Sequence, residues 1–357
     1  MNKIALASLV LVVFLAGCVG QPPTKTTTGN GLILKSFSPD FDKIRSGESI
    51  TLSAMVENVG EADATSISAE LFGLNLDGTE WSLLASQNPQ VLSILRRADT
   101  TLNLAGESYE FSWNLRSPQN LKVDNSYTAD LRVYHKYSTS SASTLKFLTY
   151  DYLKSLPSDQ FEEMKATSGV TQSQISNAPI SVEVTVGDRP LVVYDNGDTF
   201  SLQIVVSNVG SGNAFKSTAS YPGYSGTTGG TGGTSKTSLS SDDLYYVNVA
   251  ITTDLSLDCS PVLGSAKSGS IRLTRGKSKT MFCTITVPTK SGIGNSKDYS
   301  VAVDLNYGYF VDSSTSVSVL KSEASGTTTT TQAGSSGCTG GCPPGYTCTN
   351  SECVLSS

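Results

Sequence analysis

Short stretches in which apolar and polar residues alternate recur along most of the chain, and residues typical of turns separate them. The first half contains about seven such stretches: LILKSF, SITLSAMVE, TSISAELFG, EWSLLA, SYEFSWNL, TADLRVY and STLKFLT. In the second half, ISVEVTV (180–186) and STSVSVL (314–320) alternate strictly. A period of two places successive side chains on opposite faces of a strand. The pattern therefore predicts an all-β protein built from short strands.

The same order of turns and strands occurs twice. AMVENVG and IVVSNVG each end an apolar strand in Asn-Val-Gly, and Asn58 and Asn208 lie 150 positions apart. Each half then has a second glycine turn, AGESYEFSW or RGKSKTMFC, and a tyrosine-rich strand, YTADLRVYHKY (127–137) or YSVAVDLNYGY (299–309). We interpret this as an internal duplication. Strands of this length and spacing predict two immunoglobulin-like β-sandwich domains in tandem, each of about 100 residues or more.

Composition shifts divide the chain further. YPGYSGTTGGTGGTSKTS (221–238) is a Gly/Thr/Ser insertion without a counterpart in the first half. YDYLKSLPSDQFEEMKATSG (150–169) is the helical candidate; Ser158 suits its N-cap and Asp159 its first turn. The predicted order is a lipoprotein signal peptide 1–17, a flexible tether 18–30, a first domain 31–150, a connecting helical segment 151–177, a second domain 178–322 with the insertion 221–238, a Thr/Ser/Gly linker 323–336 and a small cysteine-rich module 337–357.

The repeated pattern resembles the CARDB-like domains of archaeal and bacterial surface proteins. The resemblance rests on the apolar strand with Asn-Val-Gly, the Gly-Glu-Ser turn, the aromatic strand after it and the tyrosine-rich strand, and it covers about residues 31–150 and 178–322. The second copy departs from the pattern through its insertion and its own cysteine pair. The resemblance implies an immunoglobulin-like fold and an extracellular role in adhesion or envelope assembly without catalysis.

The N-terminal residues predict export. Lys3 precedes an almost wholly apolar run, 4–16, which as a helix is about 20 Å long and too short to span a bilayer core. Leu15, Ala16 and Gly17 stand directly before Cys18, in a sequence that resembles the lipobox of lipoprotein signal peptides. An ordinary signal peptide with a chance cysteine is the alternative, but it leaves an exported thiol unpaired. We predict that Cys18 is lipidated and anchors the chain to the outer face of the cell membrane.

The other six cysteines predict disulfides, because an even number of thiols outside the membrane is typical of oxidised proteins. We expect Cys259 to pair with Cys283 within the second domain. The last four cysteines fall in a stretch with almost no apolar residues, which needs covalent links to fold. Zinc is the rival use of four thiols, but zinc sites favour tight C-x2-C pairs. Of three pairings, we predict Cys338–Cys348 with Cys342–Cys353, because interleaved bridges constrain a short loop best.

Charge and histidine content exclude several functions. The formal net charge is −6 with 16% charged residues, and phosphate binding needs clustered Lys and Arg, so nucleic acid is not an expected partner. His135 is the one histidine, and it lies on a predicted strand without a nucleophile motif, as a surface or packing residue. A Ser-His-Asp site or a His-based zinc site is not expected. We predict no enzyme activity, no cofactor and no metal.

Tyrosines supply the candidate ligand-binding residues, because aromatic rings stack on sugars. Ordinary strand tyrosines that cover a sandwich are the alternative interpretation. The six candidates are Tyr221, Tyr224, Tyr245, Tyr246, Tyr307 and Tyr309.

Together these patterns predict a lipid-anchored extracellular surface protein that acts in adhesion, envelope assembly or ligand binding, with other surface proteins or glycans as partners. One alternative is a non-catalytic polysaccharide-binding accessory of an extracellular hydrolase. Another is a subunit of a surface filament, in which a donated strand completes a neighbour's sheet. An enzyme that cleaves glycans would need a cleft with two carboxylates within about 10 Å, and we expect none.

Overall fold

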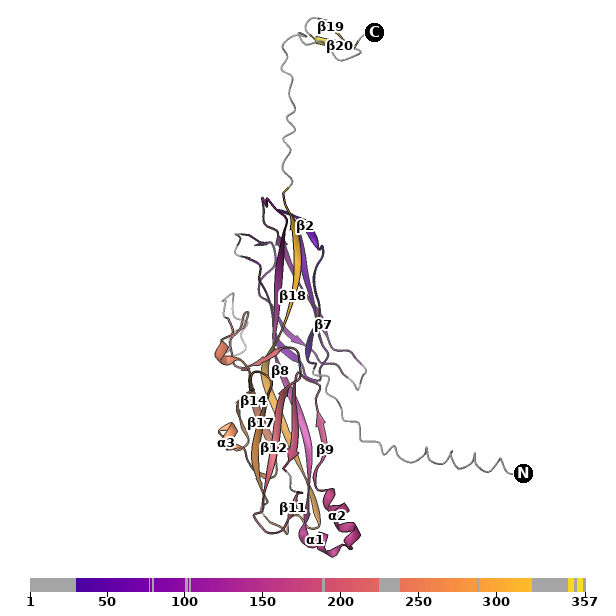
Figure 1. Ribbon diagram of the computed structural model, residues 1–357, viewed down its shortest axis with the longest axis vertical. Helices are drawn as coiled ribbons and strands as arrows, with labels where there is room; N and C mark the ends of the chain where they lie inside the picture. Colours follow the sequence, from indigo (N-terminus) through magenta and orange to yellow (C-terminus); the bar gives the residue numbers. More distant parts are fainter. Residues whose placement is uncertain are drawn as a thin grey trace, which may run out of the picture.

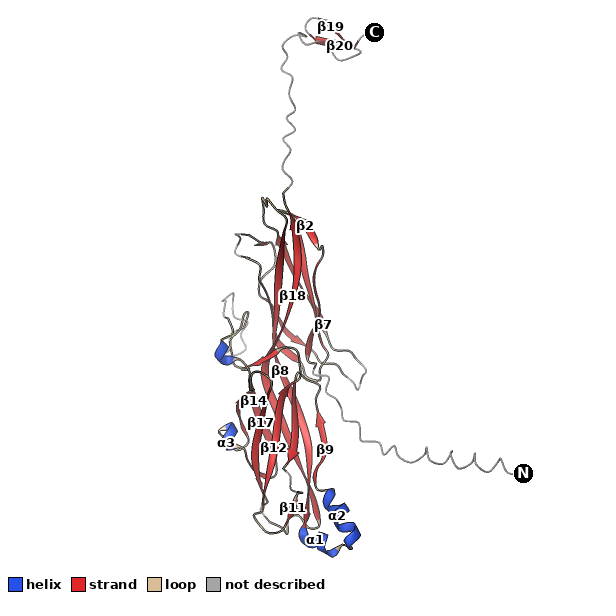
Figure 2. Ribbon diagram, viewed as in Figure 1, coloured by secondary structure: helices blue, strands red, loops and turns tan. Residues whose placement is uncertain are grey.

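The computed structural model describes residues 30–76, 78, 80–99, 102, 104–187, 190–224, 238–287, 289–322, 346–349 and 352–355. The described residues between 30 and 322 form an elongated body made mainly of strands that run along its length (Figures 1 and 2). The α-helices in the described part are short: α1 (Tyr150–Ser155), α2 (Ser158–Ala166) and α3 (Ser260–Leu263). None of these helices has the length and apolar character that crossing a membrane requires.

Each half contributes one four-stranded antiparallel sheet of its own. The sheet of the first half has the order β1 (Leu32–Pro39), β3 (Ser49–Asn58), β7 (Ser108–Arg116), β5 (Ser82–Leu83). The sheet of the second half has the order β10 (Ile180–Val186), β12 (Thr199–Asn208), β17 (Ser278–Thr286), β15 (Ser256–Asp258). The matching orders agree with an internal duplication.

The second layer is a single ten-stranded sheet that both halves share. Two 25-residue strands, β8 (Asn125–Thr149) and β18 (Ser296–Leu320), form its centre and pair antiparallel from Ser296 opposite Leu148 to Val319 opposite Asn125. On one side, β14 (Tyr246–Thr253) pairs with β18, and β16 (Ser268–Arg272) forms the edge beyond β14. On the other side, β4 (Ala64–Phe72) pairs with β8, and β6 (Gln90–Leu95) forms the edge beyond β4. Four further strands also pair with β8 or β18: β2 (Lys43–Arg45), β9 (Gly169–Ile175), β11 (Val192–Val193) and β13 (Asn213–Phe215).

The two long strands each pass from one half into the other. β8 begins beside β4 of the first half, but its end pairs with β9 and β11, which belong to the later part of the chain. β18 begins beside β14, and its end pairs in parallel with β2 of the first half. The predicted all-β, sandwich-like fold is therefore confirmed. Two separate immunoglobulin-like domains in tandem are not confirmed, because each half is completed by the end of the other half's long strand.

Strict alternation explains why the long strands hold one continuous core. Along both β8 and β18, odd-numbered residues point inward and even-numbered residues point outward. The inward residues pack with those of the facing sheets in one hydrophobic cluster, which includes Leu52, Trp113, Leu131, Ile204, Leu305 and Val317. Burial of such a cluster is the main favourable contribution to folding. The core therefore extends through both halves without a break.

A local two-fold axis passes between β8 and β18 at the centre of the body. Tyr137 and Tyr309 occupy equivalent places in the two halves, 172 positions apart. Lys136 and Gly308 are also 172 positions apart and lie opposite each other in the sheet. We call this level the waist. Gly308 is required here, because a Cβ atom on it would lie 2.1 Å from the ring of Phe215.

The insertion of the second half lies within a strand rather than at its end. In the first half, β4 is one strand with an irregular register between Thr65 and Ser68, and Ser66 there has a positive φ of 53°. In the second half the corresponding strand is split into β13 and β14. Residues 216–245, which contain the predicted insertion, separate the two pieces. The insertion therefore enters where the first half has a β-bulge.

The connection between the halves differs from the predicted helical segment 151–177. Pro157 interrupts the helix, because proline lacks an N–H and disfavours helical geometry in the residue before it. The result is two helices, and β9 follows within the same segment. Ser158 is the first residue of α2 and not its N-cap, which is Pro157 without a side-chain hydrogen bond, while Asp159 does lie in the first turn.

Candidate binding groove at the waist

The first Asn-Val-Gly turn is held in place by the tyrosine of β8. The buried Asn58 donates through Nδ2 to the carbonyls of Ala62 (2.8 Å) and Leu95 (2.9 Å). Its Oδ1 accepts from the Tyr137 hydroxyl (3.2 Å) and from the Gly60 N–H (3.3 Å). Burial raises the pKa of Tyr137 to about 12, so its hydroxyl stays protonated and able to donate at neutral pH. This arrangement fixes the residues that follow the turn.

The second Asn-Val-Gly turn repeats these contacts except one, in which the carbonyl of Gly276 takes the place of the carbonyl of Leu95. Asn208 Nδ2 donates to the carbonyls of Gly212 (2.9 Å) and Gly276 (3.2 Å). Asn208 Oδ1 accepts from the Tyr309 hydroxyl (3.0 Å), which in turn accepts from the Gly212 N–H (2.8 Å). Burial likewise raises the pKa of Tyr309 to about 12. Both turns thus lie at the waist, beside the crossing of the two long strands.

A polar groove begins directly after the first of these turns. One depression, with a volume of about 590 Å³, is lined by Glu61, Ala62, Asp63, Arg97, Ala98, Asp99, Ser138, Ser140 and Ser176. A second depression of about 500 Å³ shares Glu61, Ser140 and Ser176 with the first and continues over Ser141, Ala142, Ser173, Gln174, Ile175, Ala302 and Asp304. We call the two together the waist groove. Its residues come from both halves of the chain.

Hydrogen bonds hold the acidic side chains of the groove in place. Asp63 Oδ1 accepts from the Arg97 N–H (2.9 Å), and Glu61 Oε2 accepts from the Asn177 N–H (3.1 Å), across the junction between the halves. On the shared sheet, Asp304 Oδ1 accepts from the Ser140 hydroxyl (2.6 Å). With Asp99, the described lining has four carboxylates and one guanidinium, that of Arg97.

The first depression is lined by three carboxylates, those of Glu61, Asp63 and Asp99, and the absence of a cleft with two carboxylates within about 10 Å stays a prediction. Sequence reasoning overlooked Glu61, Asp63 and Asp304, although Glu61 and Asp63 directly follow the Asn-Val-Gly turn. The described residues hold no group of three or more His, Cys, Asp or Glu that is arranged to bind a metal ion. The arrangement can bind cationic and hydrogen-bonding groups.

The candidate tyrosines do not form a common exposed face. Tyr221, Tyr307 and Tyr309 are buried, which makes the prediction wrong for these three, because a buried ring cannot stack on a sugar. Tyr307 lies in the core with its hydroxyl 2.8 Å from Thr139 Oγ1. Tyr309 holds the second turn, as described above.

Tyr221 and the half-buried Tyr224 attach the insertion to the first half. The Tyr221 hydroxyl donates to the carbonyl of Ser66 (2.6 Å), at the β-bulge, and its ring stacks on Tyr134 with centroids 5.4 Å apart. The Tyr224 hydroxyl donates to the carbonyl of Leu92 (2.9 Å). Tyr221 therefore packs on the outer face of the shared sheet.

Tyr245 and Tyr246 are partly exposed, but other groups cover their rings. A Cβ atom on Gly276 would lie 2.7 Å from the ring of Tyr245, so this glycine packs against it. Lys216 Nζ lies 4.7 Å and Arg272 Cζ 5.6 Å from the ring centroid of Tyr246. Whether either tyrosine contacts a ligand stays a prediction.

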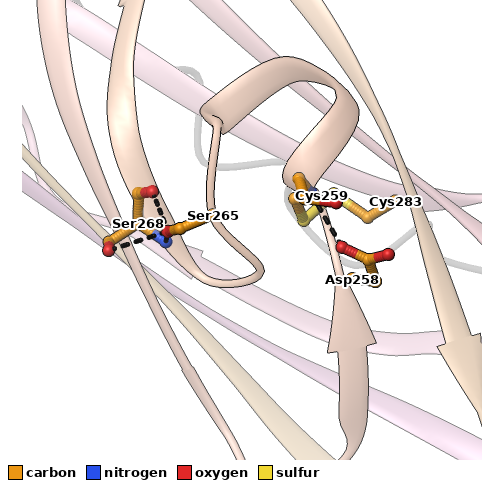
Figure 3. Close-up of a disulfide and its surroundings, with 6 residues drawn as sticks. Asp258, Cys259, Ser265, Ser268 and Cys283 are labelled. Atoms are coloured by element: carbon orange, nitrogen blue, oxygen red, sulfur yellow. Dashed lines mark hydrogen bonds between the residues drawn. A yellow bond between two sulfur atoms is a disulfide. The ribbon is translucent and has the colours of Figure 1, made fainter.

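Of the predicted cysteine pairs, Cys259–Cys283 is a disulfide, with an S–S distance of 2.03 Å. Cys259 precedes α3, and Cys283 lies on β17, so the bond joins the loop after β15 to the sheet of the second half (Figure 3). Asp258 Oδ1 accepts from the Ser260 N–H (2.9 Å) beside it, and Ser265 bonds to Ser268 in the turn that follows α3.

The remaining cysteine predictions are not tested by the fold. Cys18 lies outside the described residues, as do Cys338 and Cys342. Cys348 and Cys353 lie opposite each other in an antiparallel hairpin of β19 (Tyr346–Thr349) and β20 (Glu352–Leu355). The pairing of the last four cysteines therefore stays a prediction.

No family model and no curated protein matches the chain. Among solved structures it is similar to the Enterococcus faecalis MSCRAMM ACE, which binds its ligands by the collagen hug model, at 11% identity over 81% of this chain and 95% of that one, with a TM-score of 0.15. It is also similar to the CupB6 tip adhesin from Pseudomonas aeruginosa, at 11% identity over 81% of this chain and 99% of that one, with a TM-score of 0.14. The similarity to the collagen adhesin of S. aureus is 9% identity over 83% of this chain and 94% of that one, with a TM-score of 0.10. Similarity at this level carries no argument about function.

Proposed function

We propose that this protein is an extracellular adhesion protein that is anchored to the outer face of the cell membrane and captures its ligand in the waist groove. The observation that carries the proposal is the groove itself, which lies where the two halves meet and takes its walls from both. Ligand sites occur preferentially at such junctions. Its rim is fixed by the hydrogen bonds of Asp63, Glu61 and Asp304, so the site is preformed.

The anchor in this proposal is the lipid on Cys18. Asn30, the first described residue, adjoins the waist, since the Val59 N–H donates to the carbonyl of the next residue, Gly31 (2.9 Å). A chain of twelve residues reaches at most about 40 Å. An anchor at Cys18 would therefore hold the elongated body close to the membrane by its middle, with the groove beside the point of attachment.

The Cys259–Cys283 disulfide supports an extracellular location, because disulfides persist in oxidising compartments and are rare in the cytosol. The predicted resemblance to CARDB-like surface proteins points to the same location.

The alternative functions gain less support. A polysaccharide-binding accessory would use exposed aromatic rings, and three of the six candidate tyrosines are buried. A filament subunit would use a long exposed edge strand. The shared sheet ends in β6 and β16, of six and five residues, and short edge strands limit strand addition there. The two four-stranded sheets end in the longer strands β1 and β10, of eight and seven residues.

Two variants of the full chain test the proposal in the native cell. Ala142→Trp places a large side chain on an exposed position in the groove, and we expect it to abolish attachment of the cells to surface proteins or glycans that the wild-type cells bind. Ala250→Trp, at an exposed position of β14 outside the groove, is the matched control. Unchanged attachment in Ala142→Trp would refute the groove as the binding site.

The anchor is tested separately with Cys18→Ser. We expect this protein to be left unprocessed or released into the medium, because no thiol remains to carry the lipid. Normal processing and membrane retention of the variant would contradict lipidation.

A further inference from the structure

We infer that the loop between β6 and β7 inserts its tip into the outer surface of the membrane to which the chain is anchored. Its described residues are 96–99, 102 and 104–107, and we call it the leucine loop. The inference rests on the lipid anchor of the proposed function and adds a second, non-covalent contact with the same bilayer. Three observations carry it: two exposed leucines, a position beside the tether, and the difference from the corresponding loop of the second half.

Two leucines of this loop are exposed to solvent. Leu102 is 67% and Leu104 58% exposed. Hydrogen bonds hold the loop in shape. The Arg96 N–H donates to Glu107 Oε2 (2.8 Å) at its base, and Asp99 and Leu104 exchange two backbone hydrogen bonds (3.0 and 2.9 Å) nearer its tip. The loop therefore presents apolar side chains on an ordered backbone, as a segment that enters the interface of a bilayer does.

The leucine loop lies beside the point at which the tether leaves the body. The Asn58 N–H donates to the carbonyl of Glu107 (3.0 Å), and the Val59 N–H donates to the carbonyl of Gly31 (2.9 Å). Gly31 precedes β1 and Glu107 precedes β7, and β3 lies between these two strands. Neighbouring strands are about 4.8 Å apart, so the two points are separated by roughly 10 Å. A lipid on Cys18 therefore brings the leucine loop close to the bilayer.

The second half has a shorter loop at the equivalent place. In each half the N–H of the turn asparagine donates to the last residue of the loop, Glu107 (3.0 Å) or Lys277 (2.7 Å), so the two loops correspond. Twelve residues (96–107) connect β6 to β7, but five (273–277) connect β16 to β17. Leu273 of the shorter loop is buried. The exposed leucines are therefore an addition to the half from which the tether leaves.

The contact with the membrane is apolar rather than electrostatic. The sequence RRADTTLNLAGE (96–107) has two basic and two acidic residues, so it has no net charge to attract anionic headgroups. Two leucines alone bind a bilayer weakly. The anchor keeps them near it and so raises the effective concentration of the bilayer, which makes a weak contact sufficient. A bilayer is therefore the occupant that the position of the loop favours over a protein.

This contact positions the waist groove relative to the membrane. Arg97 and Ala98, which precede the tip of the leucine loop, line the first depression of the groove. With the lipid as one point of attachment and the loop as a second, the body does not rotate freely about its tether. The groove therefore keeps one orientation relative to the bilayer.

Quenching of tryptophan fluorescence by brominated lipid tests the inference. The full chain is purified with its anchor from the native cell and placed in vesicles of phosphatidylcholine, with or without bromine on the acyl chains. Leu102→Trp adds a fluorophore at the tip of the loop and keeps the position apolar. Val123→Trp is the matched control: Val123 is 71% exposed, and it follows β7, a strand of nine residues, at the end opposite the leucine loop. The wild type, whose Trp81 and Trp113 are buried, gives the background.

We expect brominated lipid to reduce the emission of the added tryptophan in Leu102→Trp roughly twofold, because an inserted side chain lies about 5–10 Å deep, at the boundary of headgroups and acyl chains. Val123→Trp and the wild type should be unchanged. Adding Leu104→Ser to Leu102→Trp should weaken the quenching, because one of the apolar side chains is lost.

Flotation of the vesicles separates failure of the inference from failure of the anchor. If Leu102→Trp floats with the vesicles but is not quenched, or if Val123→Trp is quenched equally, the inference is overturned and the anchor stands. A chain that does not float with the vesicles lacks the anchor, so the inference and the anchor both fail. If the added tryptophan of Leu102→Trp is unquenched in vesicles but is protected from acrylamide on the native cell, a protein covers the loop and the inference is refuted.

Discussion

The two halves of this protein hold their Asn-Val-Gly turns with closely similar hydrogen bonds, yet they differ in what covers the outer face of the shared sheet. In the second half, an insertion interrupts the strand where the first half has a β-bulge, and its Tyr221 bonds to the carbonyl of Ser66 in that bulge. On the other side of the waist, the outer face is lined by small polar residues and forms the groove. The insertion thus covers the outer face of the shared sheet on one side of the waist, and the groove lies on the other side.

The halves also differ in what they bury at equivalent positions next to the axis. His135 and Tyr307 are equivalent, 172 positions apart, and both are buried. Tyr307 has a hydrogen-bond partner in Thr139, whereas neither ring nitrogen of His135 has one among the described residues. The symmetry of the backbone is therefore not matched by symmetric polar contacts, which makes the two halves respond differently to substitution and to pH.

Among the substitutions that test these differences between the halves, Tyr221→Ala should cause the largest loss of stability. Tyr221 is fully buried against Tyr134 and Phe215, and truncation of a buried aromatic side chain costs about 4 kcal/mol. Tyr224→Ala, in the same insertion but only half-buried, should cost less than half as much. Urea unfolding measures both. If Tyr221→Ala costs under about 1 kcal/mol, the insertion does not hold the halves together.

His135 should make the protein sensitive to acid. Burial lowers its pKa to about 3, and its ring contacts those of Tyr137 and Tyr309. Below a pH of about 6.5, His135 binds a proton in the unfolded chain but not in the folded chain. The free energy of unfolding therefore decreases as the pH falls toward 3, by about 3 kcal/mol at pH 4.

The variant His135→Phe should lose this part of the acid sensitivity, because phenylalanine keeps the ring and does not titrate. Urea midpoints of wild type and variant at pH 7 and pH 4 provide the comparison. An equal loss of stability in the two proteins between these pH values would show that His135 is not responsible.

The two turn asparagines should differ in a graded way. Asn58 is fully buried and Asn208 is half-buried, although the amide group of each donates to two backbone carbonyls. Unpaired buried groups cost more than exposed ones, so we expect Asn58→Ala to cost about 3 kcal/mol and Asn208→Ala about 2 kcal/mol. Thermal or urea unfolding gives both values. A larger loss of stability in Asn208→Ala than in Asn58→Ala would mean that burial does not determine how strongly each asparagine stabilises its turn.

Much of the fold could be predicted from the sequence, because strand alternation and turn residues are local signals. The repeat predicted that Asn58 and Asn208 are equivalent, and in the structure each bonds to the residue four positions later and to the tyrosine of the long strand. The length of β8 could not be predicted. Residues 138–142, Ser-Thr-Ser-Ser-Ala, have the composition of a turn, yet Thr139 and Ser141 point inward and the strand continues. Thr139 is accepted in the core because its hydroxyl donates to the carbonyl of Ile180 (2.8 Å).

The groove was not predicted because it depends on which strands pair over long distances. Glu61 and Asp304 are more than two hundred positions apart, and they meet only because β18 lies beside β8. The tyrosine prediction failed for a related reason. Composition identifies aromatic rings that suit either a surface or a core. Tyr221 is buried by residues of the other half, namely Ser66 and Tyr134.

The central claim, that the two halves form one folding unit through β8 and β18, has a direct test. The chain's two tryptophans, Trp81 and Trp113, are both in the first half and buried, so their fluorescence reports on that half. The Cys259–Cys283 disulfide lies in the second half and closes a loop with a sequence separation of 24. Removing it with Cys259→Ala/Cys283→Ala should cost about 3 kcal/mol. In urea unfolding followed by tryptophan fluorescence, we predict that the first half loses this same amount of stability; a tryptophan transition that stays at the wild-type urea concentration would contradict the claim.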